Sequence, residues 1–128
     1  MANHISVGKI GEDLACAYLV GRKWKILGRN HREGRDEIDV VARAPDETLV
    51  FVEVKTFGGN PSGGGGTGLI PEDNMTSAKL KKLRRACEAF AGKRPELINE
   101  KRGWRIDLLA VVLGDGSEQP TIRHYENI

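Results

Sequence analysis

Residues 36–55, DEIDVVARAPDETLVFVEVK, constrain the fold more than any other part of this 128-residue chain. Two apolar, valine-rich stretches flank a turn signal at residues 44–47, which predicts two antiparallel strands joined as a β-hairpin. Side chains two positions apart on a strand share a face, so Glu37 lies with Asp39 and Glu53 lies with Lys55. Charges at alternate positions in so apolar a strand pair require a chemical explanation.

The length of the connecting loop decides which of these charges face one another. A three-residue loop at 45–47 pairs the strands so that Asp39 falls opposite Glu53 and Glu37 falls opposite Lys55. A five-residue loop keeps the same register, whereas a loop of two or four residues shifts the register by one position and separates both pairs. The three-residue loop therefore predicts two carboxylates side by side on neighbouring strands.

Two directly opposed carboxylates repel each other and destabilise a hairpin, and a cation between them removes that cost. Carboxylate oxygens suit Mg²⁺ or Mn²⁺, and Mg²⁺ commonly takes one or two carboxylates while keeping several waters. Beside such a metal, Lys55 would hold a phosphate or orient an attacking water, and the metal would lower the pKa of that water. The same alternation also fits a hairpin with one solvated face, which is common in antiparallel sheets. Both interpretations stay open on the hairpin alone.

The remaining sequence patterns alternate between helix and strand. Apolar residues recur at helical spacing in residues 6–23 and 76–92, whereas strand patterns occupy residues 24–32 and 104–113, with a short closing strand within 121–128. Residues 58–68 are rich in glycine and are expected to form a mobile loop. The order helix, three strands, helix and one or two strands predicts one α/β domain across residues 1–128, built on a mixed β-sheet flanked by helices.

The first helix has two sides that suit packing against other elements. Ser6 is expected to cap it and Gly21 to end it. The main apolar face is predicted at Val7, Ile10, Leu14, Ala17 and Tyr18, and a second side carries Gly8, Gly11, Ala15 and Leu19. A helix with two such sides is expected to lie against the sheet.

The second helix combines a buried stripe with a basic surface. The predicted stripe consists of Leu80, Leu83, Cys87 and Phe90, with Thr76 or Ser77 as the cap and Gly92 as the end. Outside the stripe stand five basic residues: Lys79, Lys81, Lys82, Arg84 and Arg85. This bias favours phosphate contacts that position a duplex without reading its sequence, and the alternative is an ordinary solvated face. Lys79, nearest the start of the helix, is expected to reach the hairpin charges.

Composition limits the class of protein without defining an activity. Charged residues make up 30% and hydrophobic residues 39%, as in ordinary soluble proteins. The net charge is only +2, so an interaction with nucleic acid depends on where the basic residues lie. Cys16 and Cys87 stand in no metal-ligand spacing and are expected to be core residues in a reducing compartment. No leader pattern and no long apolar run occurs, which predicts a cytoplasmic protein without a membrane partner.

The isolated polar residues carry less information. His4, His31 and His124 show no ligand spacing and are interpreted as incidental. Asp107 shares a strand face with Arg105 and is interpreted as half of a structural ion pair.

Several of these positions, taken in order, resemble a known family. The matching residues are Gly11-Glu12 with Ala15, Arg29-Asn30, Glu37-Ile38-Asp39, Phe51-Val52-Glu53-Val54-Lys55, Lys79 and Arg105-Ile106-Asp107. They resemble the YraN-like family of uncharacterised bacterial proteins, and the resemblance covers nearly the whole chain. That family is similar to the PD-(D/E)xK nuclease superfamily, especially the archaeal Holliday-junction resolvases. The resemblance implies a restriction-endonuclease-like fold.

The resemblance also implies roles for individual residues. Asp39 and Glu53 would bind Mg²⁺ or Mn²⁺, and Lys55 would be the catalytic lysine. Glu12 would be a further acidic residue that the first helix brings to the site, although its spacing alone fits better with a solvated charge near a helix start. Glu37 would support the site, for example by pairing with Lys55, rather than bind the metal.

The activity implied by the resemblance is hydrolysis of phosphodiester bonds in DNA, favoured over RNA, with branched DNA as a substrate and a homodimer as the working form. Two departures affect substrate binding: Asp36 stands where the family commonly has glycine, and Thr56-Phe57 follow Lys55 where an arginine is usual. The alternative is a non-catalytic nucleic-acid-binding protein that retains the nuclease fold. A metal-binding or assembly module without a nucleic-acid role is a third interpretation.

Overall fold

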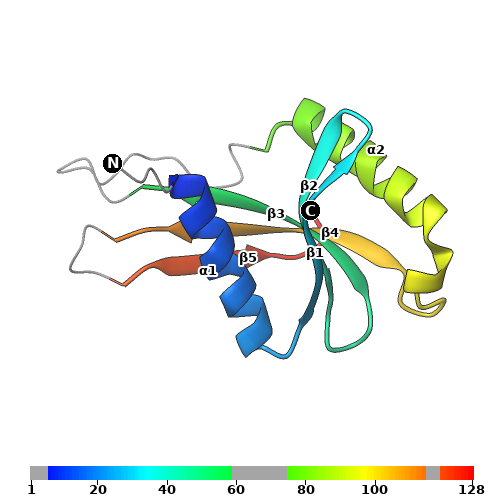
Figure 1. Cartoon of the computed structure of the whole chain (residues 1–128), viewed down its shortest axis with the longest axis horizontal. Helices are drawn as coiled ribbons and strands as arrows, with labels where there is room; N and C mark the ends of the chain where they lie inside the picture. Colours follow the sequence, from blue (N-terminus) through cyan, green and yellow to red (C-terminus); the bar gives the residue numbers. More distant parts are fainter. Residues whose placement is uncertain (1–5, 59–74, 115–118) are drawn as a thin grey trace, which may run out of the picture.

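The computed structural model describes residues 6–58, 75–114 and 119–128, and the order of its elements is the predicted one (Figure 1). The elements are α1 (Val7–Gly21), β1 (Lys25–Glu33), β2 (Asp36–Arg43), β3 (Leu49–Phe57), α2 (Ser77–Lys93), the short 3-10 helix η2 (Pro95–Leu97), β4 (Trp104–Val112) and β5 (Thr121–Tyr125). The glycine-rich loop predicted at 58–68 lies outside the described residues from position 59 onward.

The five strands form one sheet in the order β1-β2-β3-β4-β5. All neighbouring pairs are antiparallel except β3 and β4, which are parallel and are joined through α2. A parallel pair needs such a crossover connection because a tight turn cannot join it. The mixed sheet and its flanking helices confirm the predicted fold class.

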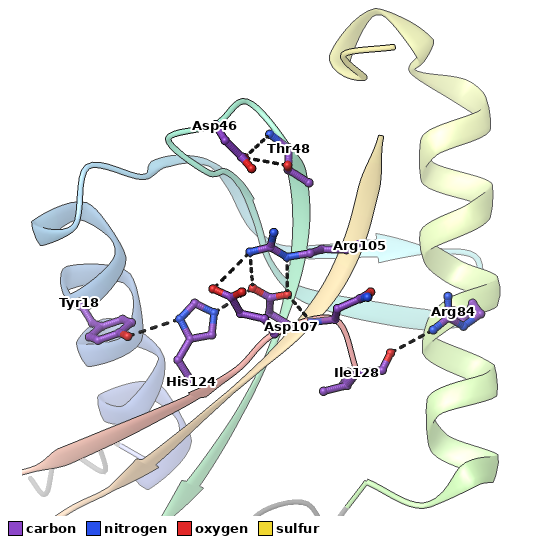
Figure 2. A network of polar contacts seen from close by, with 10 residues as sticks. Tyr18, Asp46, Thr48, Arg84, Arg105, Asp107, His124 and Ile128 are labelled. Carbon is purple, nitrogen blue, oxygen red and sulfur yellow. Dashed lines mark hydrogen bonds and ion pairs between the residues drawn. The ribbon is translucent and has the colours of Figure 1, made fainter. Parts of the chain in front are cut away.

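The register of the β2–β3 hairpin is the one predicted for a three-residue loop. Arg43 pairs with Leu49, and the pairing continues in step to Val40 and Val52. The turn is closed by the side chain of Asp46, whose Oδ1 accepts hydrogen bonds from the backbone N–H and the hydroxyl of Thr48 at 3.0 and 2.7 Å (Figure 2). The hairpin charges are therefore placed by a well-defined turn.

Each face of the sheet carries one helix and one apolar core. Neighbouring residues of β3 show this division, because Val52 packs in the cluster that contains Leu19 of α1, whereas Phe51 packs in the cluster that contains Phe90 of α2. Burial on both faces explains why the central strands read as nearly continuous apolar runs. The two cysteines are buried and free, as expected for core residues.

The predicted main apolar face of α1 was right only in part, because Leu14 and Tyr18 pack against the core as partly buried residues. Val7 and Ile10 are 48% and 37% exposed, and the buried residues of the helix are Gly11, Ala15, Cys16 and Leu19. A Cβ atom added at Gly11 would lie 1.8 Å from the hydroxyl oxygen of Thr56 in β3. The helix thus approaches the sheet so closely that its small-residue side faces inward.

The predicted caps of both helices and the predicted buried stripe of α2 agree more closely with the structure. Ser6 caps α1 and Thr76 caps α2, each through a side-chain oxygen that accepts a backbone N–H. Helix α1 ends at Gly21 as predicted, whereas α2 continues one residue beyond Gly92, to Lys93. In the stripe of α2, Leu83, Cys87 and Phe90 are buried and Leu80 is partly buried. Within the described ranges, no helix is long and apolar enough to cross a membrane.

A polar network centred on Asp107 joins α1, β4 and β5 (Figure 2). Asp107 is fully buried, and its carboxylate accepts two hydrogen bonds from Arg105, at 2.8 and 3.1 Å, and one from the backbone of Asn127 at 2.9 Å. His124 lies 2.8 Å from the same carboxylate through Nε2, and its Nδ1 lies 3.4 Å from the hydroxyl of Tyr18. The predicted ion pair is present, but His124 is not incidental, because it links α1 to the sheet.

Candidate active site

The sheet loses its regular alternation at Asp39. Ile38 packs on the α2 side and Val40 packs on the α1 side, although residues two apart on a regular strand share a face. In the neighbouring strand β1, Asn30 adopts a left-handed conformation with φ of 51°. The ladder between β2 and β3 ends at the pair of Val40 and Val52, so the predicted pairs of Asp39 with Glu53 and of Glu37 with Lys55 are not part of it. The side chain of Asp39 then replaces a strand partner, because its Oδ2 accepts the backbone N–H of Val54 at 2.9 Å.

The carboxyl groups of Asp39 and Glu53 interact with each other. Burial raises the pKa of Asp39, the negative charge of Glu53 raises it further, and a hydrogen bond between the two carboxyls acts in the same direction. The N–H of Val54 opposes these effects, and the resulting pKa is about 7. Near neutral pH, Asp39 is therefore only partly ionised, and a cation at this position would neutralise the repulsion as a proton does.

Lys55 completes this cluster. Its Nζ atom lies 3.2 Å from Oε2 of Glu53, and its side chain is 29% exposed. Among the described residues, the ion pair of Lys55 is with Glu53 and not with Glu37, which corrects the pairing expected for Glu37. Glu37 is exposed and borders the same pocket as Glu53 and Lys55. The structure thus brings Asp39, Glu53 and Lys55 together and leaves Glu37 at the margin.

Two pockets meet at Lys55, one on each side of the sheet. The pocket beside α1 has a volume of about 420 Å³ and is bordered by Glu12, Asn30, Asp39 and Lys55. The pocket beside α2 has a volume of about 170 Å³ and is bordered by Glu53, Lys55, Lys79 and Lys82. Carboxylates and amines alternate around this junction, which suits a ligand that contains both a cation and phosphate groups.

Glu12 is held at the first pocket by strand β1. Its Oε1 accepts hydrogen bonds from Arg29 at 3.1 Å and from the side-chain amide of Asn30 at 2.9 Å. The Glu12 side chain is only 15% exposed, and its charge contributes to the raised pKa of Asp39. The spacing of Glu12 favoured a solvated charge on the helix, and this prediction was wrong because the side chain is largely buried.

The donor set available to a metal is a pair of carboxylates. Across residues 6–58, 75–114 and 119–128, no group of three or more His, Cys, Asp and Glu side chains is arranged to hold a metal ion. Mg²⁺ often takes only one or two protein carboxylates and completes its shell with water and substrate phosphate. Asp39 and Glu53 fit this mode because they are two interacting carboxyl groups, and the charge of Glu53 already raises the pKa of Asp39.

The five basic residues predicted as one surface on α2 point in different directions. Lys79 and Lys82 border the pocket with Glu53, and Arg85 lies 3.6 Å from Asp36. Arg84 instead donates to the backbone oxygen of Ile128 at 3.1 Å (Figure 2) and borders neither pocket at Lys55. Lys81 is exposed and does not border either pocket at the junction.

Two further basic residues, Arg35 and Lys93, lie near Arg85 and were not predicted from the sequence. A third pocket of about 320 Å³ lies between α2 and the β1–β2 turn and is bordered by Arg35, Arg85 and Lys93. Lys93 lies fourteen positions after Lys79 on α2, which is close to four full helical turns. The helical spacing of Lys79 and Lys93 could have predicted that the basic residues extend along α2 for more than two turns.

The fold and this cluster define an α/β domain with a candidate metal and phosphate site, and the sequence comparisons place the chain in a family. Residues 11–111 match the family described as uncharacterised protein family UPF0102. A UPF0102 protein of Anaeromyxobacter dehalogenans is 36% identical over 120 residues, which cover 94% of this chain and 81% of the relative. A UPF0102 protein of Rhodococcus opacus is 36% identical over 127 residues, with 97% of this chain and 96% of the relative covered. The chain belongs to the UPF0102 family, as the YraN-like motifs predicted.

Replacing Asp39 with asparagine is expected to stabilise the metal-free protein at alkaline pH. Because the folded-state pKa is raised from 3.8 to about 7, ionisation of Asp39 disfavours the folded state as pH rises through this window. Removing the charge should raise the free energy of unfolding by at least the cost of opposed like charges, about 0.2–1 kcal/mol. The gain should vanish near pH 4, where the carboxyl is protonated in the folded state.

Urea unfolding in the presence of a chelator at both pH values measures this effect. Glu37→Gln removes an exposed carboxylate of the same strand and serves as the control, for which little change is expected. An Asp39→Asn variant that is less stable than the parent at alkaline pH would contradict the carboxylate repulsion.

Proposed function

We propose that this protein is a nuclease that depends on Mg²⁺ or Mn²⁺ and hydrolyses phosphodiester bonds in DNA, with branched DNA as the preferred substrate. The observation that supports the proposal is the interaction between the carboxyls of Asp39 and Glu53, together with Nζ of Lys55 at 3.2 Å from Oε2 of Glu53. A strand pair gains no stability from two repelling carboxylates, so their placement favours a role in cation binding. The family resemblance adds the PD-(D/E)xK pattern to this argument.

Asp39 and Glu53 would hold the cation, and each would contribute a carboxylate oxygen. When bound, the cation supplies charge stabilisation at phosphorus and lowers the pKa of a coordinated water. Lys55 would place its ammonium group against a phosphate oxygen, where it stabilises charge that develops in the transition state. Glu12, on the opposite side of the larger pocket, would accept a hydrogen bond from the attacking water.

One observation favours the alternative of a non-catalytic nucleic-acid-binding protein. The arginine that usually follows the lysine in this superfamily is replaced by Thr56, and Thr56 packs against Gly11 of α1. This position therefore carries no cation toward a substrate. The basic side chains of α2 would supply that contact instead, and Lys82 and Arg85 are the members best placed to do so.

Salt dependence should show which basic residues contact phosphate. Replacing Lys82 and Arg85 together with glutamine is expected to weaken DNA binding for all sequences alike. The slope of log affinity against log salt should flatten by about 0.9 for each lost phosphate contact. The matched control replaces Lys81 and Arg84, which carry the same charges on the same helix but border none of the three pockets described above, whereas Lys82 and Arg85 each border one.

Fluorescence anisotropy of labelled DNA at several salt concentrations measures both slopes. Equal slopes for the parent and the Lys82/Arg85 variant would show that this side of the helix is merely solvated. If the Lys81/Arg84 control flattened the salt slope more, the DNA would bind on the other side of α2.

The proposed activity is tested by incubating the parent protein with single-stranded, duplex, flap and four-way-junction DNA in Mg²⁺ and in Mn²⁺. Metal-dependent cleavage of the branched substrates is expected, with none in a chelator. Salt-dependent binding without cleavage of any substrate would favour the non-catalytic alternative. The homodimer implied by the resemblance is a separate prediction, which sedimentation velocity would check.

A further inference from the structure

The backbone of β1 changes direction at Asn30, beside the candidate site. Consecutive residues of a strand normally point to opposite faces, yet Arg29 and Asn30 both bond to Glu12 on the α1 side. The next residue, His31, returns to the α2 side and makes an edge-to-face contact with Phe90, with ring centroids 4.9 Å apart. The left-handed φ of 51° at Asn30 accounts for the irregularity, and asparagine is among the few residues other than glycine that adopt this conformation readily.

The two donors to Glu12 are not equivalent. Arg29 divides its guanidinium between Glu12 and Asp13, and its contact to Asp13 is the shorter one, at 2.7 Å against 3.1 Å. The side-chain amide of Asn30 donates to Glu12 at 2.9 Å. Asn30 also borders the 420 Å³ pocket together with Glu12 and Asp39, whereas Arg29 does not. Asn30 is therefore the donor that fixes Glu12 on the pocket side.

The chemistry of the amide matters as much as its position. Glu12 already pairs with the guanidinium of Arg29. The neutral N–H donor of Asn30 orients the carboxylate further without adding a second cation, so Glu12 keeps more of its strength as a hydrogen-bond acceptor. A lysine or arginine at position 30 would add that second cation. Glycine would adopt the backbone conformation but offer no donor. Asparagine satisfies both requirements at once.

We propose that Asn30 is a positioning residue that holds the Glu12 carboxylate toward Asp39 for the hydrolytic step. This inference rests on the proposed nuclease function. It assigns a role that depends on two properties of one residue, its left-handed backbone and its amide donor.

The test uses two variants that preserve the backbone of β1. Asn30→Gly retains the left-handed conformation and removes only the amide, whereas Asn30→Asp retains the shape and places a carboxylate against Glu12. Asn127→Gly is the matched control, because Asn127 has a φ of 55° and lies outside both pockets at Lys55. Each protein is assayed for Mn²⁺ affinity by calorimetry and for kcat and KM on the DNA substrate that the parent cleaves best.

For Asn30→Gly, we expect kcat to fall by about 10–10²-fold, as for a misplaced catalytic group, with KM and Mn²⁺ affinity unchanged. The kcat of Asn30→Asp should fall further, and the kcat of Asn127→Gly should equal that of the parent. The decisive comparison adds Asn30→Gly to Glu12→Gln. If Asn30 acts through Glu12, the double variant should be no slower than Glu12→Gln alone, because the two residues act as one unit.

Three results would overturn the role of Asn30. They are an unchanged kcat for Asn30→Gly, additive losses in the double variant, and an equal loss in Asn127→Gly. Each of these can occur while the parent cleaves DNA, so each leaves the proposed function intact. A parent protein that binds no Mn²⁺ and cleaves nothing would instead overturn the proposed function, and the role of Asn30 with it.

Discussion

Lys55→Ala is expected to slow metal-dependent DNA cleavage by about 10²-fold or more, which is the usual loss when one group that stabilises transition-state charge is removed. Mn²⁺ should still bind, because Asp39 and Glu53 keep their carboxylates. Removal of the ammonium group that lies 3.2 Å from Glu53 should, if anything, strengthen the attraction of the pair for a cation. Calorimetric Mn²⁺ affinity and single-turnover cleavage rates measured on the same preparation separate the two effects.

Lys81→Ala is the control for Lys55→Ala, since it removes an exposed lysine that borders neither pocket at the junction. It should cleave like the parent. If Lys55→Ala lost metal binding as well as cleavage, the lysine would serve to maintain the carboxylate pair. If it lost neither, the catalytic role assigned to Lys55 would be wrong.

Asp107→Ala is expected to lower the free energy of unfolding by about 3–5 kcal/mol, the usual cost of breaking a buried ion pair by removing one partner. The substitution would leave Arg105 and His124, which are 20% and 12% exposed, without their carboxylate. It would also leave the backbone N–H of Asn127 without an acceptor. Because His124 also contacts Tyr18, the loss should loosen α1 against the sheet.

The destabilisation at Asp107 should depend on pH. Burial alone raises the pKa of Asp107, but hydrogen bonds from His124, Arg105 and the Asn127 backbone outweigh burial, and the pKa lies below its ordinary value of 3.8. A carboxyl with a lowered pKa stabilises the fold above that ordinary value and loses this contribution as pH falls through the folded-state pKa. The difference in free energy of unfolding between the parent and Asp107→Ala should therefore be largest near neutral pH and should shrink below about pH 4.

Urea unfolding at neutral and acidic pH measures this prediction. Glu126→Gln is the matched control, because Glu126 lies 3.7 Å from the same arginine but is 63% exposed. Its effect should stay under about 1 kcal/mol, as for exposed ion pairs. A loss at Asp107 no larger than that of the control would mean that the network contributes little to the fold.

The sequence was sufficient to predict those parts of the fold that depend on local pattern. The valine-rich alternation and the three-residue turn predicted the pairing of Val40 with Val52. The helix caps followed from Ser6 and Thr76 because capping is a short-range interaction. These features need no knowledge of how the elements pack together.

Features that depend on packing distance were not predictable in the same way. The buried face of α1 follows from how closely Gly11 approaches Thr56, and helical periodicity favoured the larger apolar residues on the other side. Similarly, the separation of Arg84 from Lys82 depends on the rotation of α2 about its axis and on the position of Ile128. Apolar spacing alone could not determine either arrangement.

At the candidate site, the side chains of β2 do not alternate between the two faces of the sheet as they do in a regular strand. Strict alternation places Ile38 and Val40 on one face, but the structure places them on opposite faces around Asp39. His124 illustrates a second limit, since its partner Asp107 lies seventeen residues earlier and is brought near only by the pairing of β4 with β5. The buried position of Asp107 in an apolar strand was the available sign that partners must exist.

The central claim is that Asp39 and Glu53 together bind one divalent cation, and calorimetric titration with Mn²⁺ tests it most directly. The parent is expected to bind one Mn²⁺ per chain, with release of protons near neutral pH because Asp39 must give up its proton. Asp39→Asn and Glu53→Gln should each abolish or strongly weaken this binding, whereas the exposed-site control Glu37→Gln should retain it. A parent that binds no Mn²⁺, or an Asp39→Asn variant that binds it as tightly as the parent, would contradict the claim.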